Sequence, residues 1–249
     1  MTIRRLSAVS ALLALCLACA GASSSTGGEV ALRTDLEGGC YGQPDQGFDL
    51  DNFANVEVFA EVGEPAWDFT LQTLDGGEVH LAELLETKPV VVFSGSYTCP
   101  VYQKSGPKID QLAKRLGQRV HVVVVYGPEA HPENDNSPYR GDNWAKPEKF
   151  SHHDLAESFE ERVAHAKKVG RGPGVIEAVE PLDNPFWCTY GTAPNAAYLI
   201  GQDRRFHAVH DWFDAPTLIG SIGALLGEDL GQDRGQPGEK RGRRTKRRR

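Results

Sequence analysis

The chain has 249 residues, of which 40% are hydrophobic, and its formal net charge is −7. The charges are segregated, because residues 233–249 hold nine Lys or Arg against two acidic residues, which leaves the rest of the chain strongly acidic. This length fits one globular domain with additional segments at its ends. An acidic body excludes nucleic acid as the main ligand of the folded part, because phosphate binding needs concentrated positive charge.

The N-terminus has the pattern of an export signal. Two arginines precede an apolar stretch that ends in Ala-Cys-Ala at 18–20, small residues that a signal peptidase accepts. We therefore expect a signal peptide over residues 1–20, and an exported protein that is periplasmic, membrane-anchored or secreted. The sequence before and at Cys19 also resembles the end of a bacterial lipobox, so a lipid anchor at Cys19 and plain secretion stay open as alternatives.

Composition divides the remainder into three segments. Residues 21–55 are rich in Ser, Gly, Asp and Asn without periodicity, which predicts a flexible linker and an irregular lead-in. Residues 56–230 carry the regular patterns and predict one folded domain. Residues 231–249 are charged and lack apolar side chains, which predicts a disordered basic tail.

The folded part begins with a predicted β-hairpin. Residues 63–71 and 78–81 flank the turn signal Asp-Gly-Gly at 75–77. A short helix is expected over 81–85. The continuous Val-Val-Val-Phe run at 90–93 is typical of a strand that is covered on both faces.

A strand, helix, strand unit follows. Apolar residues spaced i, i+3, i+4, i+7 over 109–116 predict a helix that ends at Gly117. The Val-rich run at 121–126 predicts a second strand, parallel to the first. Residues 127–150 form a long polar loop with four prolines, and residues 155–169 predict an amphipathic helix.

The last predicted elements complete the fold. We expect a weak strand at 175–179, a short turn or helix around 184–190, two strands at 196–200 and 205–209, and a closing helix at 217–226. A parallel βαβ unit followed by an antiparallel ββα unit is the element order of a thioredoxin-like fold. The sequence therefore predicts an α/β protein with a central mixed sheet flanked by helices and an N-terminal β-hairpin.

One cysteine lies where the buried strand passes into the first long helix. Cys99 follows Phe-Ser-Gly-Ser-Tyr-Thr, and Pro100 suits the first helical position. The helix dipole and the first-turn N–H groups stabilise a thiolate, which predicts a lowered pKa and a nucleophilic sulfur at Cys99. Tyr102 stands where a CxxC motif would have its second cysteine, so ordinary dithiol exchange is excluded.

The other cysteines bear on how this thiol is used. Loss or lipidation of Cys16 and Cys19 leaves Cys40, Cys99 and Cys188, an odd number, so at least one thiol is free or intermolecular. Cys188 is either a resolving thiol for Cys99 or a structural partner of Cys40, and the pairing with Cys40 is favoured. Neither the cysteines nor the histidines have metal-ligand spacing, and we expect no metal site.

Two segments resemble the iodothyronine deiodinase family. Residues 93–102 are similar to its active-site segment, in which selenocysteine followed by Pro takes the place of Cys99. Residues 126–132, Tyr-Gly-Pro-Glu-Ala-His-Pro, are similar to its second signature. The similarity extends over about 90–200. It implies a thiol-dependent oxidoreductase that catalyses reductive dehalogenation, as thyroxine 5'-deiodinase does, or related thiol redox chemistry.

The resemblance also implies roles for individual residues. Cys99 becomes the nucleophile, His131 an acid/base, Glu129 the residue that orients His131, and Ser96 a polar neighbour. We expect a small-molecule substrate, an external thiol reductant and no bound cofactor. His152 or His153 corresponds to a further family histidine.

The expected substrate contacts come from the fold. In a thioredoxin-like fold, the Thr-Ala-Pro sequence before a strand places a cis-proline, here Pro194, beside the reactive cysteine. We expect Pro194 and Tyr102 to contact the substrate.

Departures from the family keep other functions open. Cys99 is less nucleophilic than selenocysteine, Tyr97 replaces a frequent family cysteine, and residues 206–212 lack the family's Gly-rich turn with its arginine. The alternatives are a single-cysteine thiol peroxidase and a non-enzymatic exported binding protein on the same fold. A homodimer is also open.

Overall fold

The computed structural model describes residues 30–36, 38, 58–132 and 154–231. The strands are β1 Thr70–Thr73, β2 Glu78–His80, β3 Val90–Gly95, β4 His121–Tyr126, β5 Val175–Val179, β6 Ala197–Ile200 and β7 Phe206–His210. The helices are α1 Leu81–Leu85, α2 Pro100–Leu116, α3 Phe159–Lys168, α4 Pro185–Tyr190 and α5 Ala215–Leu226.

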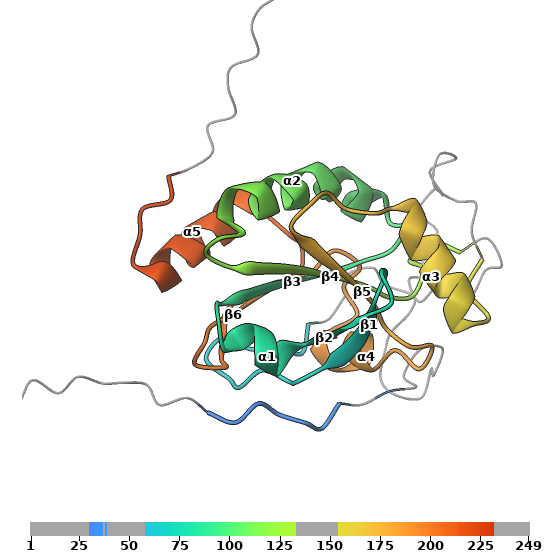
Figure 1. Cartoon of the computed structure of the whole chain (residues 1–249), viewed down its shortest axis with the longest axis horizontal. Helices are drawn as coiled ribbons and strands as arrows, with labels where there is room; N and C mark the ends of the chain where they lie inside the picture. Colours follow the sequence, from blue (N-terminus) through green and yellow to red (C-terminus); the bar gives the residue numbers. More distant parts are fainter. Residues whose placement is uncertain (1–29, 37, 39–57, 133–153, 232–249) are drawn as a thin grey trace, which may run out of the picture.

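The strands form one mixed sheet in the order β2-β1-β5-β4-β3-β6-β7 (Figure 1). β3 and β4 are parallel and are joined through α2, β6 is antiparallel to β3, and β7 is antiparallel to β6. This is the predicted thioredoxin-like arrangement. β5 extends it in parallel beside β4, and the predicted hairpin β1–β2 adds to the edge of β5 in antiparallel orientation.

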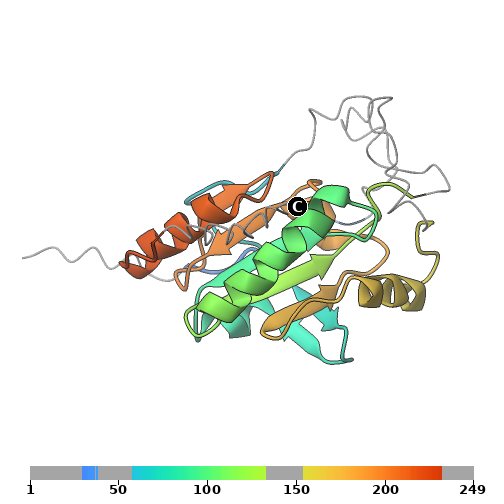
Figure 2. The ribbon, with the colours of Figure 1, turned by 90° about the horizontal axis from the view of Figure 1, so that it is seen from above.

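Helices cover both faces of the sheet. Figure 1 shows α2 and α5 on one face and α1 and α4 on the other, and Figure 2 shows α2 lying over the sheet, nearly along the direction of its strands. Side chains of β3 alternate between the two cores, because successive residues of a strand point to opposite faces. Val91 and Phe93 pack in the α2–α5 core, whereas Val90 and Val92 pack in the α1–α4 core. This double burial explains the uninterrupted apolar run.

Two helices begin at different residues from those predicted. α3 begins at Phe159 because Ser158 caps it, its Oγ accepting a hydrogen bond from the N–H of Glu161 at 3.2 Å. α5 begins at Ala215 because Asp214 accepts one from the N–H of Thr217 at 3.0 Å. Of the predicted loop 127–150, only residues 127–132 are described.

The predicted signal peptide and basic tail lie outside the described residues. Within the described ranges, no helix has the length and apolar character needed to cross a membrane.

Candidate active site

The thiol of Cys99 is placed at the N-terminal end of α2 by the loop that follows β3. Cys99 is the N-cap of this helix, with Sγ accepting a hydrogen bond from the N–H of Tyr102 at 3.4 Å, and Pro100 is the first helical residue. Cys99 is a free cysteine and is only 1% exposed. The predicted junction of strand, cysteine and helix is therefore present, and the sulfur lies below the surface.

The predicted lowering of the Cys99 pKa is wrong. Burial raises the pKa of this thiol to about 11, the N–H groups of Tyr102 and Val101 act in the opposite direction, and the charge of Glu129 raises the pKa further. Removal from water disfavours the thiolate more than the helix N-terminus stabilises it. In the folded protein the thiol form of Cys99 is therefore favoured over the thiolate at neutral pH.

The carboxylate of Glu129 ties the second signature to the cysteine loop. Its Oε2 accepts hydrogen bonds from the N–H and the hydroxyl of Thr98, at 2.8 and 2.7 Å, and its Oε1 accepts one from the hydroxyl of Tyr126. The hydroxyl of Thr98 in turn accepts the N–H of His131 at 2.9 Å. Thr98 directly precedes Cys99, so these bonds fix the loop that carries the thiol.

Ser96 supplies a further bond between the same two loops. Its Oγ accepts the N–H of Ala130 at 3.2 Å, and Ser96, Glu129 and His131 are all buried. The loops meet because β3 and β4 are parallel and end at the same edge of the sheet. The structure thus brings together the four residues that the sequence singled out for catalysis, Cys99 included.

His165 is a site residue that the sequence reasoning missed. It lies on α3 and is 6% exposed, with Nδ1 at 3.9 Å from Oε1 of Glu129 and Nε2 at 3.9 Å from Oε1 of Glu161. Its buried position on α3 is shared with Arg162, three residues before it. His152 and His153 lie outside the described residues.

Tyr102 has a different role from the one predicted. It is 1% exposed, and its ring packs so closely on Gly95 that a Cβ there would overlap it. The guanidinium of Arg171 lies 5.4 Å from the ring centre, and burial raises the pKa of the phenol well above its usual value. Tyr102 therefore packs in the core beside Gly95, and its contact with a substrate stays a prediction.

Pro194 is buried beside the ends of β3 and β4, but its predicted cis bond is wrong, because the described residues contain no cis peptide bond. The hydroxyl of Ser94 donates to the carbonyl of Ala193 at 2.6 Å and accepts the N–H of Ala196 at 3.0 Å. These bonds tie the segment to the end of β3, and its X–Pro bond is trans, as most X–Pro bonds are.

Cys188 is disulfide-bonded, so it has no thiol with which to resolve an oxidised Cys99. This corrects the resolving role. The alternative pairing concerns Cys40, which lies outside the described residues. Among the residues that the structure describes, no group of three or more His, Cys, Asp or Glu is arranged to hold a metal ion.

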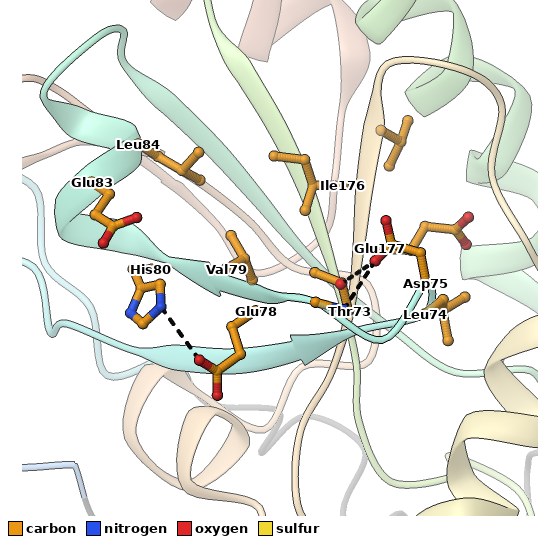
Figure 3. A pocket seen from close by; sticks show the side chains of 12 residues that line it. Thr73, Leu74, Asp75, Glu78, Val79, His80, Glu83, Leu84, Ile176 and Glu177 are labelled. Atoms are coloured by element: carbon orange, nitrogen blue, oxygen red, sulfur yellow. Dashed lines mark hydrogen bonds and ion pairs between the residues drawn. The ribbon is translucent and has the colours of Figure 1, made fainter.

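A separate pocket of about 480 Å³ lies between the β1–β2 hairpin, α1 and β5 (Figure 3). Apolar side chains such as Val79, Leu84 and Ile176 line it, and Glu78 pairs with His80 at 3.7 Å. None of the residues predicted for catalysis lines this pocket.

Comparison with known proteins adds independent observations. The family model for iodothyronine deiodinase matches residues 47–208. Type II iodothyronine deiodinase of Rattus norvegicus is 30% identical over 118 residues, covering 47% of this chain and 39% of the relative. The enzyme of Fundulus heteroclitus is 26% identical over 182 residues, covering 63% of this chain and 64% of the relative. The chain thus matches less than two thirds of the length of these relatives.

Solved structures with similar backbones have low sequence identity to this chain. The exposed lipoprotein thioredoxin of Streptococcus pneumoniae is 18% identical, with a TM-score of 0.47, covering 64% of this chain and 99% of that one. A thioredoxin-like protein of Aeropyrum pernix is 11% identical, with a TM-score of 0.43, covering 64% of this chain and 88% of that one.

Proposed function

This chain belongs to the iodothyronine deiodinase family, and we propose that it is a thiol-dependent oxidoreductase in which Cys99 takes the place of selenocysteine in reductive dehalogenation. The observation that carries the proposal is the pair of hydrogen bonds from Thr98 to Glu129. They join the cysteine loop to the Glu-Ala-His-Pro segment, which supports the proposal that Cys99 and His131 serve one site.

The proposed reaction uses one nucleophile and one acid/base. His131 accepts the proton of the Cys99 thiol, and the thiolate sulfur attacks the iodine of an aryl iodide. A sulfur–iodine bond forms as the carbon–iodine bond breaks, and the carbon takes the proton back from His131. This sequence suits a buried thiol that is protonated at rest, because the proton removed from sulfur is the one that the product carbon needs.

An external thiol then restores the enzyme. It attacks the sulfenyl iodide of Cys99, which releases iodide and a proton and leaves a mixed disulfide. A second thiol releases Cys99 as the free thiol and leaves as the oxidised disulfide. The carbon–iodine bond gains the two electrons that the external thiols lose. A single-cysteine site without a resolving partner requires such a reductant, and the disulfide state of Cys188 supports this requirement.

Glu129 and His165 act as positioning residues in this proposal. Glu129 holds Thr98 and Tyr126, and His165 lies within 3.9 Å of its Oε1. We extend the proposal to the cellular setting that the N-terminal pattern predicts, an exported protein that meets small-molecule substrates and thiols outside the cytoplasm, with Cys19 as the candidate lipid anchor.

Iodide release tests the proposal. The full chain is incubated with an iodinated phenol and dithiothreitol, next to Cys99→Ser, His131→Ala and the control Glu78→Gln from the separate pocket. We expect release by the native chain and the control, none by Cys99→Ser, and a loss of about 10²-fold or more in His131→Ala. Release that persists in Cys99→Ser contradicts the proposal. Cys99-dependent consumption of hydrogen peroxide without iodide release favours the thiol peroxidase, and neither activity favours the binding protein.

A further inference from the structure

A groove of about 230 Å³ runs between α2 and α5, which lie on the same face of the sheet (Figure 1). Leu112 of α2 and Ile219 of α5 form its floor, because both side chains belong to the core beneath the helices. Ala215 and Pro216, the first two residues of α5, line it from the other side. These two side chains are short, so they leave a space above the floor that longer side chains would fill.

Positive charge lies along the α2 side of the groove. Lys108 and Arg115 both line it, and both are exposed. Their positions on α2 differ by two helical turns, which separates them by about 10 Å along the axis. None of the described residues that line the groove is acidic. The groove therefore combines an apolar floor with two cations at its edge.

The neighbouring groups that the structure describes do not cancel this charge. The guanidinium of Arg115 donates to the carbonyl of Gly231 at 3.3 Å, and a carbonyl group carries no net charge. Asp214 caps α5 beside the groove, and its Oδ2 accepts the N–H and the hydroxyl of Thr217 at 3.0 and 2.6 Å. Lys108 is near enough to help lower the pKa of Asp214. One carboxylate does not neutralise two cations, so the groove is positive in a chain whose net charge is −7.

A ligand for this groove must match both its charge and its floor. We infer that it binds a small organic anion with an apolar body, whose carboxylate pairs with Lys108 while the body lies on Leu112 and Ile219. Burial of the body removes apolar surface from water, and the ammonium of Lys108 supplies a charge-assisted hydrogen bond. Pockets for drug-sized ligands have volumes of about 300–1,000 Å³, so this smaller groove suits a smaller molecule.

The inferred site is separate from the candidate active site. None of the residues predicted for catalysis lines the groove. Cys99 is the N-cap of α2, whereas Lys108 and Arg115 lie further along the same helix. The inference therefore does not depend on the reaction that Cys99 performs, and its test does not use iodide release.

Calorimetric titration of the full chain with 4-phenylbutyrate and with octanoate tests the charge and the apolar body of the ligand. We expect saturable binding of at least one of these anions at one site. The amine 4-phenylbutylamine has the opposite charge and acetate lacks the apolar body, so both are expected to bind at least about tenfold more weakly. Acetate also measures simple pairing of anions with the basic residues 233–249. Failure of both anions to saturate, or equal binding of the amine or of acetate, overturns the inference.

Matched variants test the location of the site. Lys108→Gln is expected to weaken binding about tenfold, because it removes the charge-assisted hydrogen bond. Lys104→Gln is the control, since Lys104 is exposed one turn earlier on α2 and does not line the groove. It should leave the affinity unchanged. Ala215→Leu keeps both cations but narrows the groove, and it should also weaken binding.

Thermal unfolding of each variant shows that it is folded, because all three substitutions are outside the buried core. Native affinity in Lys108→Gln, or an equal loss in Lys104→Gln, overturns the inference and assigns the binding to another basic segment. A membrane surface is the alternative partner for the same cations. Phosphatidylglycerol vesicles that bind the native chain more strongly than Lys108→Gln, when neither small anion binds, overturn the inference in favour of membrane docking.

Discussion

At the scale of single residues, the chemistry of Cys99 is decided by a competition between burial and the helix N-terminus. The N–H groups of Tyr102 and Val101 favour the thiolate, but the cost of burying a charge is larger. In the proposed reaction Cys99 therefore attacks only after a base removes its proton. This gives the Glu-Ala-His-Pro segment, which carries the proposed base His131, a role beside that of the thiol.

The charge of Glu129 should be measurable through the thiol. Because this charge raises the pKa of Cys99, Glu129→Gln is expected to lower that pKa by about one unit or less. The measurement is the ultraviolet absorbance of the thiolate against pH, taken as the difference from Cys99→Ser. Glu78→Gln is the control and should leave the titration unchanged. A native pKa below about 8.5 contradicts the dominance of burial.

Glu180 directly follows β5 and is fully buried. Its carboxyl group should make the stability of the protein depend on pH. Its pKa rises from 4.5 to about 7 on folding, so the folded chain keeps a proton that the unfolded chain releases between these values. The stability that this proton provides is complete below pH 4.5 and is lost as the pH rises to about 7. Glu180→Gln is neutral throughout and should gain about 3 kcal/mol over the native chain across this range.

Urea unfolding at several pH values measures this difference. The free energies of unfolding of the native chain and Glu180→Gln should diverge between pH 4.5 and 7 and run parallel above it. A constant difference over the whole range means that folding does not raise the pKa of Glu180, which contradicts the prediction. Gly220→Ala provides the control for ordinary pH effects on the fold.

The residues of the site were predictable to different degrees. Cys99 was evident because a cysteine between a solid apolar strand and a helix has few other interpretations. Glu129 and His131 were found through the family resemblance. His165 was missed because its place depends on tertiary packing, in which α3 brings it to Glu129. The lowered pKa failed because burial depth is invisible in a sequence.

At the scale of elements, the close approach of β3 and α2 is the feature that positions the thiol. Gly95 ends β3, and the ring of Tyr102 from the first turn of α2 lies directly on it. Any side chain at this point pushes the helix away from the sheet. The strand and the helix can be predicted from the periodicity of their apolar residues. The contact between them cannot, because it depends on Gly95 meeting Tyr102, seven residues later in the sequence.

Gly95→Ala is therefore expected to destabilise the protein by about 1–3 kcal/mol, the usual cost of overpacking a core. It should also displace Cys99, because Tyr102 N–H is bonded to its sulfur. Thermal unfolding measures the first effect and the rate of Cys99 alkylation the second. Gly220→Ala, at an exposed position inside α5 where a Cβ meets nothing within 4 Å, should leave the alkylation rate unchanged and raise the stability by about 1 kcal/mol or less. A Gly95→Ala protein with native stability and native alkylation contradicts the proposed contact.

At the scale of the whole molecule, element order was enough to predict the fold. The parallel βαβ unit followed by the antiparallel ββα unit fixes the core sheet, and the hairpin and β5 extend one edge of it. Helix starts were less predictable, because capping by Ser158 and Asp214 decides them locally. Which cysteines form a disulfide depends on their distance in the folded protein. Their spacing in the sequence does not give that distance.

The disulfide of Cys188 is expected to join distant parts of the chain. Cys99 is free and Cys188 is bonded, and loss of the predicted signal leaves Cys40 as the remaining cysteine, so we expect Cys40 to be its partner. A bridge between residues so far apart restricts the unfolded chain strongly, and its removal should cost about 2–5 kcal/mol. Non-reducing peptide mass mapping identifies the pair, and denaturant unfolding of Cys188→Ser measures the loss. A Cys188-containing peptide linked to Cys99 contradicts both this pairing and a free nucleophile.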